Sequence, residues 1–388
     1  MSEWKECTLD KISSYINRGF SPQYVESNGN LIINQRCIRN GRIDLSYAKL
    51  VNKNKTITLE KVLQKGDILI NSTGVGTAGR VGIFNYTILA TVDSHITIIR
   101  IDENKANPLF VFYNLRSREL DIESFAEGST GQIELSRERV KIINLLLPPL
   151  PEQKAIAGVL SSLDDKIDLL HRQNKTLEAM AETLFRKWFV EDADKWWEDG
   201  TIANLIDFNP SRKLVKGVNV PYLEMAALST STFMPDYWYN RVFTSGTKFI
   251  NGDTLLARIT PCLENGKTAY ITFLKNNDVA WGSTEYIVMR PKAHIHTFFA
   301  YILARTKEFR DYAEGCLEGS SGRQRVNIDH LKDYEIAQPN RNVIEKFNSH
   351  SELIVPKLIS NMNQIQTLEK LRDTLLPKLM SGEVRMEF

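Results

Sequence analysis

The chain has 388 residues, of which 42% are hydrophobic and 25% are charged, and this composition is typical of a globular protein with two or three domains rather than of a disordered chain. The formal net charge is only +2, whereas a protein that held DNA by itself through phosphate contacts would be more basic. Four scattered cysteines without a C-x-x-C pair, no signal peptide and no apolar stretch of ~20 residues predict a cytoplasmic protein without a disulfide framework, a zinc cluster or a membrane partner.

The sequence contains two copies of one segment, about 190 residues apart. Lys65-Gly66-Asp67 reappears as Asn251-Gly252-Asp253, and the Gly-Ser-Thr-Gly run at 128–131 reappears as Gly-Ser-Ser-Gly at 319–322. Because several such matches keep their order along the chain, they predict duplicated domains rather than a solenoid. The glycine–serine run occurs in both copies, which favours a shared structural or phosphate-binding role for it.

Each copy begins with a mixed domain and ends with a long helix. In the first copy, strands are predicted over 67–71 and 96–101 and a helix over 108–123, and the second copy has a strand at 285–290 and a helix at 297–314. We therefore predict an α+β fold made of a mixed domain (1–150), a central helix (151–190), a second mixed domain (191–340) and a C-terminal helix (341–388).

The central helix follows the breaking run Pro148-Pro149-Leu150-Pro151 and carries an apolar seam in alternating steps of four and three residues. The C-terminal helix has a similar seam, with Ser351 and Arg372 as flaws on it and two prolines, Pro356 and Pro377, within it. Both seams are satisfied if the helices pack on each other as an antiparallel coiled coil; the alternative is that each helix belongs to the core of its own domain. The seam positions are Ile156, Leu160, Leu163, Ile167, Leu170, Asn174, Leu177, Ala181, Leu184 and Trp188, then Phe347, Ile354, Leu358, Asn361, Ile365, Leu368, Leu375 and Leu379.

Two of these seam residues are polar. A buried Asn174 or Asn361 can fix the register of a coiled coil; exposure near the middle of each helix is the alternative.

None of the motifs that would indicate catalysis is complete in this sequence. Gly74-Val-Gly76-Thr-Ala-Gly79 has the form G-x-G-x-x-G, but strand formers follow it where a dinucleotide site needs a helix, so we predict a loop between strands. Phe208-Asn209-Pro210 lacks the rest of an amino-methyltransferase loop, no Walker motif is present, and the pair His294 and His296 lacks a partner for metal binding. We predict no catalytic residue, no cofactor and no metal.

Several runs resemble the specificity subunits of type I restriction–modification systems, and the resemblance covers essentially the whole chain. They are Pro149-Leu-Pro-Glu-Gln-Lys-Ala-Ile-Ala157, Leu163-Asp-Asp-Lys-Ile167, Leu184-Phe-Arg-Lys-Trp-Phe189 and Leu376-Pro-Lys-Leu-Met-Ser-Gly-Glu383. The second copy departs from the pattern, because Pro339-Asn340-Arg341-Asn342 replaces the Pro-Glu-Gln run.

The resemblance implies a non-catalytic subunit in which each mixed domain recognises one half of a bipartite sequence in double-stranded DNA. The two helices set the distance between the halves and dock two adenine methyltransferase subunits, and endonuclease/translocase subunits complete the enzyme. A central helix of ~39 residues would be ~58 Å long, equal to roughly 17 base pairs. The docking candidates are Glu152, Gln153, Leu163, Ile167, Leu177, Leu184, Leu368 and Leu375.

Loops with Arg, Lys, Gln and Thr can reach base edges and phosphates, so they supply the candidate DNA contacts. For each such residue, a solvated surface charge is the alternative. The candidates are Arg36, Arg39, Arg42, Thr73, Thr77 and Arg80 in the first domain and Arg212, Lys213, Arg258, Lys267, Arg323, Gln324 and Arg325 in the second.

Two other functions fit the same sequence. One is a DNA-independent protein–protein scaffold, which the low net charge favours. The other is a methyltransferase or nuclease whose site carries no recognisable motif.

Overall fold

The computed structural model describes residues 4–53, 57–128, 133–193, 197–275, 278–320 and 322–386. The chain divides into two compact units, one made of residues 1–166 with 367–388 (unit 1) and the other of residues 167–366 (unit 2). The division cuts across both long helices, α5 (Leu150–Arg186) and α9 (Arg341–Ser381). Each unit therefore combines one mixed domain with a segment of each long helix.

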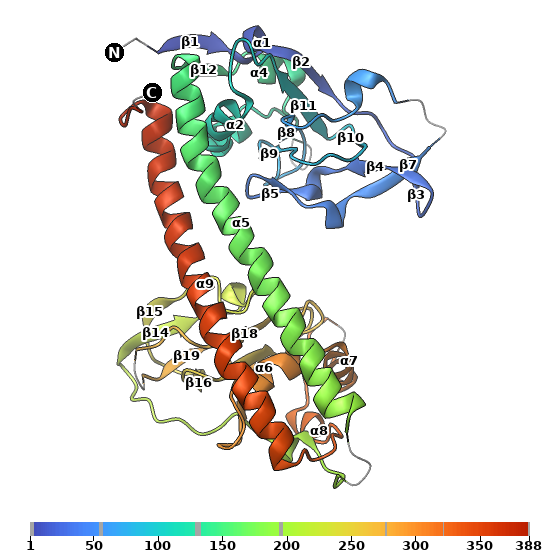
Figure 1. Cartoon of the computed structure of the whole chain (residues 1–388), viewed down its shortest axis with the longest axis vertical. Helices are drawn as coiled ribbons and strands as arrows, with labels where there is room; N and C mark the ends of the chain where they lie inside the picture. Colours follow the sequence, from blue (N-terminus) through green and yellow to red (C-terminus); the bar gives the residue numbers. More distant parts are fainter. Residues whose placement is uncertain are drawn as a thin grey trace. The chain divides into compact units, whose positions relative to one another are not determined.

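Unit 1 contains two four-stranded sheets (Figure 1). The first is antiparallel in the order β2-β11-β8-β9, and the second has the order β10-β4-β7-β3, with β10 parallel to β4. The bounds are β2 (Ser13–Arg18), β11 (Ile96–Ile101), β8 (Ile68–Asn71) and β9 (Val81–Ile83), then β10 (Ala90–Val92), β4 (Gly29–Ile33), β7 (Lys49–Asn52) and β3 (Tyr24–Val25).

The remaining elements of unit 1 are short. The predicted helix 108–123 is two helices, because the chain breaks between α2 (Pro108–Arg116) and α3 (Glu119–Ser124). The Asn107 side chain accepts a hydrogen bond from the Phe110 N–H and Pro108 occupies the first turn, a combination that favours helix initiation there. The others are β1 (Lys5–Thr8) paired with β12 (Asn144–Leu147), β5 (Ile38–Arg39) paired with β6 (Arg42–Ile43), α1 (Leu9–Ile12), α4 (Arg137–Lys141) and the turns η1 (Gln35–Cys37), η2 (Leu45–Tyr47) and η3 (Leu59–Lys61).

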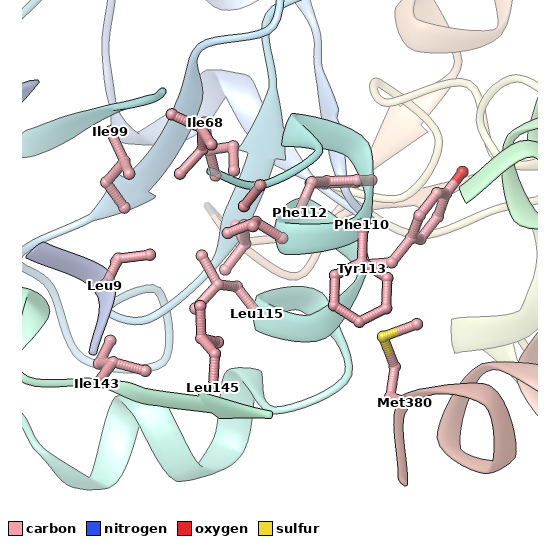
Figure 2. Packing of buried hydrophobic residues seen from close by; sticks show 14 of the residues in the cluster. Leu9, Ile68, Ile99, Phe110, Phe112, Tyr113, Leu115, Ile143, Leu145 and Met380 are labelled. Atoms are coloured by element: carbon pink, nitrogen blue, oxygen red, sulfur yellow. The ribbon is translucent and has the colours of Figure 1, made fainter. Parts of the chain in front are cut away.

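Helix α2 is the centre of the unit 1 core. Its apolar side chains are buried between the first sheet and the long helices, and Figure 2 shows Phe110 and Tyr113 of α2 close to Met380 of α9. Ile156 and Leu160 of α5 belong to the same cluster. The core of the mixed domain therefore continues without a break into the helix pair.

Partly buried polar contacts also connect α5 to its neighbours within unit 1. Asp164 accepts hydrogen bonds from Tyr113 Oη (2.9 Å), Arg116 Nη1 (3.1 Å) and Arg372 Nη1 (2.9 Å), and thus joins α2, α5 and α9. Glu152, only 1% exposed, accepts from Nε (2.6 Å) and Nη2 (2.8 Å) of Arg385. Glu152 near the start of α5 thus pairs with Arg385, which follows the end of α9, and Asp164 farther along α5 pairs with Arg372 within α9, so the two helices are antiparallel here.

Unit 2 repeats the first sheet as the antiparallel sheet β13-β20-β17-β18. Its second sheet, β15-β14-β19-β16, repeats the parallel pair and one antiparallel neighbour, but its fourth strand lies beside β19, whereas β3 of unit 1 lies at the opposite edge, beside β7. The predicted helix 297–314 is again two helices. The bounds are β13 (Ile206–Phe208), β20 (Tyr286–Pro291), β17 (Thr254–Ala257), β18 (Thr268–Tyr270), β15 (Tyr239–Val242), β14 (Asn219–Leu223), β19 (Ala280–Gly282), β16 (Thr247–Phe249), β21 (Leu317–Glu318), β22 (Arg325–Val326), α6 (Phe298–Arg305), α7 (Lys307–Gly315), α8 (Ile328–Lys332), η5 (Ile202–Asn204) and η6 (Met225–Ala227). The repeated first sheet and parallel pair confirm the predicted duplication.

The long helices are antiparallel in unit 2 as well. Asn361 Nδ2 donates to Asn174 Oδ1 at 2.8 Å, and both side chains are buried. Nearer the end of α5, the ring of Phe185 packs on that of Phe347 near the start of α9. The prediction of an α+β fold with antiparallel long helices is confirmed, and the alternative that each helix serves only its own domain is wrong, because both helices contribute to both units.

The bounds of the two long helices, and the environment of the residues that interrupt the predicted seam, differ slightly from the prediction. Helix α5 begins at Leu150, continues to Arg186 and is followed by a π-helical turn, Lys187–Glu191. Helix α9 runs without interruption through Pro356 and Pro377. Arg372, a flaw on the predicted seam, pairs with Asp164 instead. Among the described residues, no helix is both long and apolar enough to span a bilayer.

The Asn174–Asn361 pair supports a stability prediction. Replacement of one partner by Leu removes the 2.8 Å hydrogen bond between the two buried amides, and the loss of a buried hydrogen bond costs about 1–3 kcal/mol. We expect Asn174→Leu and Asn361→Leu each to lower the melting temperature, and the double variant to regain part of the loss. A double variant that melts below both single variants would contradict this view of the pair.

The Glu152–Arg385 pair supports a prediction about pH. The hydrogen bonds from Arg385 lower the pKa of Glu152 in the folded chain, so its ionised form stabilises the fold above the unfolded pKa of ~4.3. We expect Glu152→Gln to melt lower than the parent chain at pH 7, and the difference to shrink as the pH falls below ~4. Thermal melts across that range test it.

A matched control for this measurement lies in the same part of the chain. Glu383 forms an exposed pair with Lys378 at 2.9 Å, and such surface pairs contribute only ~0–1 kcal/mol. Glu383→Gln should therefore leave the melting temperature nearly unchanged across the same pH range. Equal effects of the two substitutions would mean that the burial of Glu152 has no energetic consequence.

Candidate nucleic-acid interface

The candidate arginines of the first domain lie on and before a tight hairpin. Strands β5 and β6 pair Ile38 with Ile43 and Arg39 with Arg42, and the two turn residues, Asn40 and Gly41, have φ angles of +51° and +78°. These angles are typical of a type I′ turn, which Asn-Gly sequences favour. Arg39 is exposed and Arg42 is half-buried.

The second group of candidates lies in the loop between β8 and β9, as predicted for the Gly74–Gly79 motif. Thr73 Oγ1 lies 2.7 Å from His95 Nδ1, and Thr77 Oγ1 donates to the Thr73 and Gly74 carbonyls at 3.2 Å. Arg80 Nη2 donates to the Gly76 carbonyl at 2.8 Å. The loop is held by its own hydrogen bonds, with no helix at its glycines to bind a pyrophosphate.

The structure brings these two groups together. The Gln35 carbonyl accepts from Asn71 Nδ2 at 3.0 Å, and Gln35 Oε1 accepts from Thr73 Oγ1 at 3.3 Å. On the other side of the hairpin, Gly41 forms a β-bridge with Gly82 of β9. The segments that carry the six unit 1 candidates, 35–42 and 72–80, therefore border on each other.

The arginines of this region differ from most others of unit 1 in their partners. Arg18, Arg100 and Arg116 each pair with a carboxylate. The guanidinium groups of Arg36 and Arg39 instead lie over one ring, that of Tyr47, at 5.3 and 4.4 Å from its centroid. Arg36 and Arg39 therefore concentrate positive charge at this edge of unit 1, and neither of these two forms an ion pair with a carboxylate in the described part of the chain.

In the second domain, four candidates come together around two loops. Ile259 and Arg325 form a β-bridge, the Gln324 carbonyl accepts from the Thr260 N–H at 3.1 Å, and Arg258 Nη2 donates to the Val326 carbonyl at 3.2 Å. Arg325 also donates twice to the Glu285 carboxylate, at 2.8 and 3.0 Å. Arg323 is exposed in the same segment.

The other candidates of unit 2 have structural partners or lie elsewhere. Arg212 Nη2 donates to both carboxylate oxygens of the fully buried Asp253, at 2.8 and 3.0 Å, and Arg290 Nε lies 2.8 Å from the same group. Burial raises the pKa of Asp253, and the two arginines oppose that shift. Lys267 Nζ donates to the Met225 carbonyl at 2.8 Å, and Lys213 is exposed beside Arg212.

An aromatic–arginine cluster in unit 2 was not among the sequence candidates. Arg241, on the exposed strand β15, lies with its guanidinium 4.7 Å from the Tyr222 centroid and 5.5 Å from that of Trp281. Tyr239 packs on Tyr222 at 5.4 Å. The run Tyr237-Trp-Tyr-Asn-Arg241 is the signal that could have revealed it, because aromatic residues beside a cation are typical of recognition surfaces.

The docking candidates on the long helices fall into two classes. Glu152, Gln153 and Ile167 are buried, and Gln153 uses its amide inside unit 1, where Oε1 accepts from the Asn107 N–H (2.9 Å) and Nε2 donates to the Pro148 carbonyl (2.8 Å). The half-buried candidates are Leu163, Leu177, Leu184, Leu368 and Leu375. Apolar side chains that the seam did not include are more exposed: Leu169 (40%), Met180 (52%), Leu353 (76%) and Leu371 (44%).

The two glycine–serine runs, 128–131 and 319–322, lie partly outside the described residues. Residues 129–132 and Ser321 lie outside the described residues. Their predicted structural or phosphate-binding role stays a prediction. Within the described ranges, no cluster of three or more His, Cys, Asp or Glu side chains is arranged to hold a metal ion.

Comparison with known proteins agrees with this geometry. A family model for the type I restriction modification DNA specificity domain matches residues 1–179. The specificity subunit of the type I restriction enzyme HindI from Haemophilus influenzae is 23% identical over 99% of this chain and 100% of its own length. That of MjaIX from Methanocaldococcus jannaschii is 25% identical over 84% of this chain and 79% of its own length.

The fold is also similar to that of a solved protein. The crystal structure of a type I restriction–modification S subunit from M. genitalium aligns with a TM-score of 0.60 at 16% identity, over 97% of this chain and 96% of that one. The fold similarity extends over both copies of the repeat, beyond the residues that the family model matches. Residues 1–179 thus match the model of the type I restriction modification DNA specificity domain, and nearly the whole chain is similar in sequence to type I specificity subunits.

Proposed function

We propose that this chain is the DNA-specificity subunit of a type I restriction–modification enzyme, and that each mixed domain recognises one half of a bipartite target in double-stranded DNA. One observation carries the proposal. The loop after the Gly-Asp strand pairs with the segment after the glycine–serine run in both units, but the paired residues are Thr73 and Glu134 in one and Ile259 and Arg325 in the other. The scaffold is shared while its side chains differ, as two half-sites of different sequence require.

The charge of the chain supports a role within a complex. Phosphate contacts supply most of the affinity of proteins that bind DNA alone, and a net charge of +2 provides little of it. We propose that two adenine methyltransferase subunits supply the rest, and that endonuclease/translocase subunits join them in the cytoplasm. The chain itself then needs no catalytic residue.

The long helices are the proposed docking site for these partners. Leu169 and Met180 on α5 and Leu353 and Leu371 on α9 are exposed apolar side chains on otherwise polar surfaces, and such side chains are typical of protein interfaces when they gather. The half-buried leucines of the seam can extend this surface. Glu152 and Gln153 would contribute indirectly, by holding unit 1 together, because their side chains are buried.

Exchange of the first mixed domain tests whether each mixed domain recognises its own half of the target. The full chain is expressed with its methyltransferase partner in a host that lacks this modification, and the methylated motif is determined by sequencing of the modified genome. Replacement of residues 1–150 by the equivalent domain of another family member should change one half of the motif and leave the other half intact. A change in both halves would contradict the proposal.

The same experiment separates the rival functions. A protein–protein scaffold would leave no sequence-specific methylation even with the partner present. A catalytic chain would transfer methyl groups from S-adenosylmethionine without any partner.

We also propose that α5 and α9 set the number of base pairs between the half-sites. Deletion of one heptad from each helix, at paired positions so that the seam is preserved, should shorten the spacer of the methylated motif and leave the bases of both halves unchanged. An unchanged spacer with full methylation would show that helix length does not control it. A substitution of seven exposed polar positions on both helices, with the length and the side chains Leu169, Met180, Leu353 and Leu371 kept, is the control.

A further inference from the structure

We infer that the hairpin Arg39-Asn40-Gly41-Arg42 of unit 1 enters the major groove of the DNA and that Arg39 recognises a guanine in the half-site of the first domain. The inference rests on the proposed function and names the base and the side chain that this function requires. A two-stranded ribbon fits the width of the major groove, and an arginine that donates two hydrogen bonds to O6 and N7 is the commonest specific contact with guanine.

The hairpin is anchored from its inner face. Ile38 and Ile43 are paired across it and buried in the core. The Tyr86 hydroxyl donates to the Ile43 carbonyl at 2.6 Å, and the Asp44 N–H donates to the Cys37 carbonyl at 2.8 Å. Because residues alternate between the faces of a strand, Arg39 and Arg42 lie on the face opposite the two isoleucines.

The turn at the hairpin tip leaves little room for change. Gly41 has a φ angle of +78°, and a Cβ added there would lie 2.8 Å from the Arg116 guanidinium. Asn40 takes the other left-handed position of the turn, which Asn tolerates. The tip therefore enters a groove already ordered, with little conformational entropy left to lose on binding.

Arg39 is itself held in one arrangement. Its Nε donates to the Arg36 carbonyl at 3.1 Å, and its guanidinium lies over the Tyr47 ring. Asn34 fixes both neighbours, because its Oδ1 accepts from the Arg36 N–H at 2.9 Å and its Nδ2 donates to the Tyr47 carbonyl at 2.6 Å. Because Nε is already hydrogen-bonded, the terminal nitrogens Nη1 and Nη2 of Arg39 are the two donors that can reach O6 and N7 of one guanine.

The electrostatics favour a negatively polarised ligand here. Arg36 and Arg39 lie over the same Tyr47 ring, so two positive charges lie close together. The nearby Asp44 carboxylate accepts its hydrogen bonds from the Ser46 N–H (2.9 Å) and hydroxyl (2.7 Å). A guanine edge or a phosphate would offset the repulsion between the two guanidinium groups.

The equivalent segment of unit 2 has different chemistry. It follows η6 as the hairpin follows η1, and the Ala227 carbonyl accepts from the Asp236 N–H at 2.9 Å as Cys37 does from Asp44. Residues 228–235 contain four hydroxyl side chains and no cation: Ser229, Thr230, Ser231 and Thr232. A contact to phosphate would be needed in both units, whereas a contact to a base is expected to differ between them.

The test uses the full chain with its methyltransferase partner and duplexes that carry the methylated motif. Each guanine of the motif is replaced in turn by 7-deazaguanine, which lacks the N7 acceptor and still pairs with cytosine. For the parent chain, one replacement in the half-site of the first domain should weaken binding ~5- to ~100-fold. For Arg39→Ala, binding to the unmodified duplex should be weakened by a similar factor and should no longer respond to that replacement.

Two further variants make the result decisive. Arg39→Lys keeps the charge but loses the planar fork of donors, so it should bind more tightly than Arg39→Ala and respond to the 7-deazaguanine less than the parent does. Arg137→Ala removes an exposed arginine that pairs with Glu138 at 3.2 Å in α4 and should behave like the parent. Melting curves identify any variant that does not fold, in which case Arg39→Lys alone carries the comparison.

The outcomes separate this inference from the proposed function. If both Arg39 variants respond to every 7-deazaguanine as the parent does, or if the half-site of the first domain contains no guanine on either strand, the hairpin does not recognise guanine. If the parent chain with its partner binds no duplex specifically, the proposed function itself fails.

Discussion

Three carboxylates of helix α5 connect it to other elements: Glu152 is fully buried, Asp164 and Glu178 are half-buried, and each has a partner on another element. A buried charge without a partner is strongly destabilising. Glu152 is paired with an arginine from the C-terminal segment, Asp164 with side chains of α2 and α9, and Glu178 accepts from the Tyr301 hydroxyl of α6 at 2.5 Å. Burial raises the pKa of Glu178, which the hydrogen bond from Tyr301 opposes. One helix thereby fixes a mixed domain in each unit.

This arrangement allows the sequence of the loops to vary while the contacts of the long helices are kept. The pairs made by α5 and α9 depend on residues of the two helices and of α2 and α6, outside the loops that carry the candidate DNA contacts, and one of them, Arg116, packs against the hairpin at Gly41. Those loops have their own support, from short hydrogen bonds such as those of Gln35 and Asn34 in unit 1 and the Arg325–Glu285 pair in unit 2. Substitution in the loops can therefore change recognition at little cost to the core.

The burial of Glu152 and Gln153 shows that they support the fold from inside, whereas the sequence motif suggested them for partner docking. The Pro-Glu-Gln run resembles a conserved feature of the family's central helix, and the sequence suggested Glu152 and Gln153 for partner docking. In the structure Glu152 pairs with Arg385 and Gln153 supports the start of α2. The exposed apolar side chains of the helices, such as Met180 and Leu353, belong instead to the docking site that we propose. Arg212 likewise supports the fold, because its guanidinium neutralises the buried Asp253.

The sequence by itself determined the duplication, the long helices and the resemblance to type I specificity subunits, since these depend on repeated local patterns and on periodicity that does not change with tertiary context. The apolar seam predicted which faces of the helices are buried, and the glycines at 74–79 were correctly predicted as a loop. Only the tertiary structure decided which charged residues are paired and which are presented, because an arginine that meets a buried carboxylate and one that stacks on an exposed tyrosine look the same in one dimension. The partners of Arg39 and Arg212 lie up to tens of residues away, and chain folding alone brings them together.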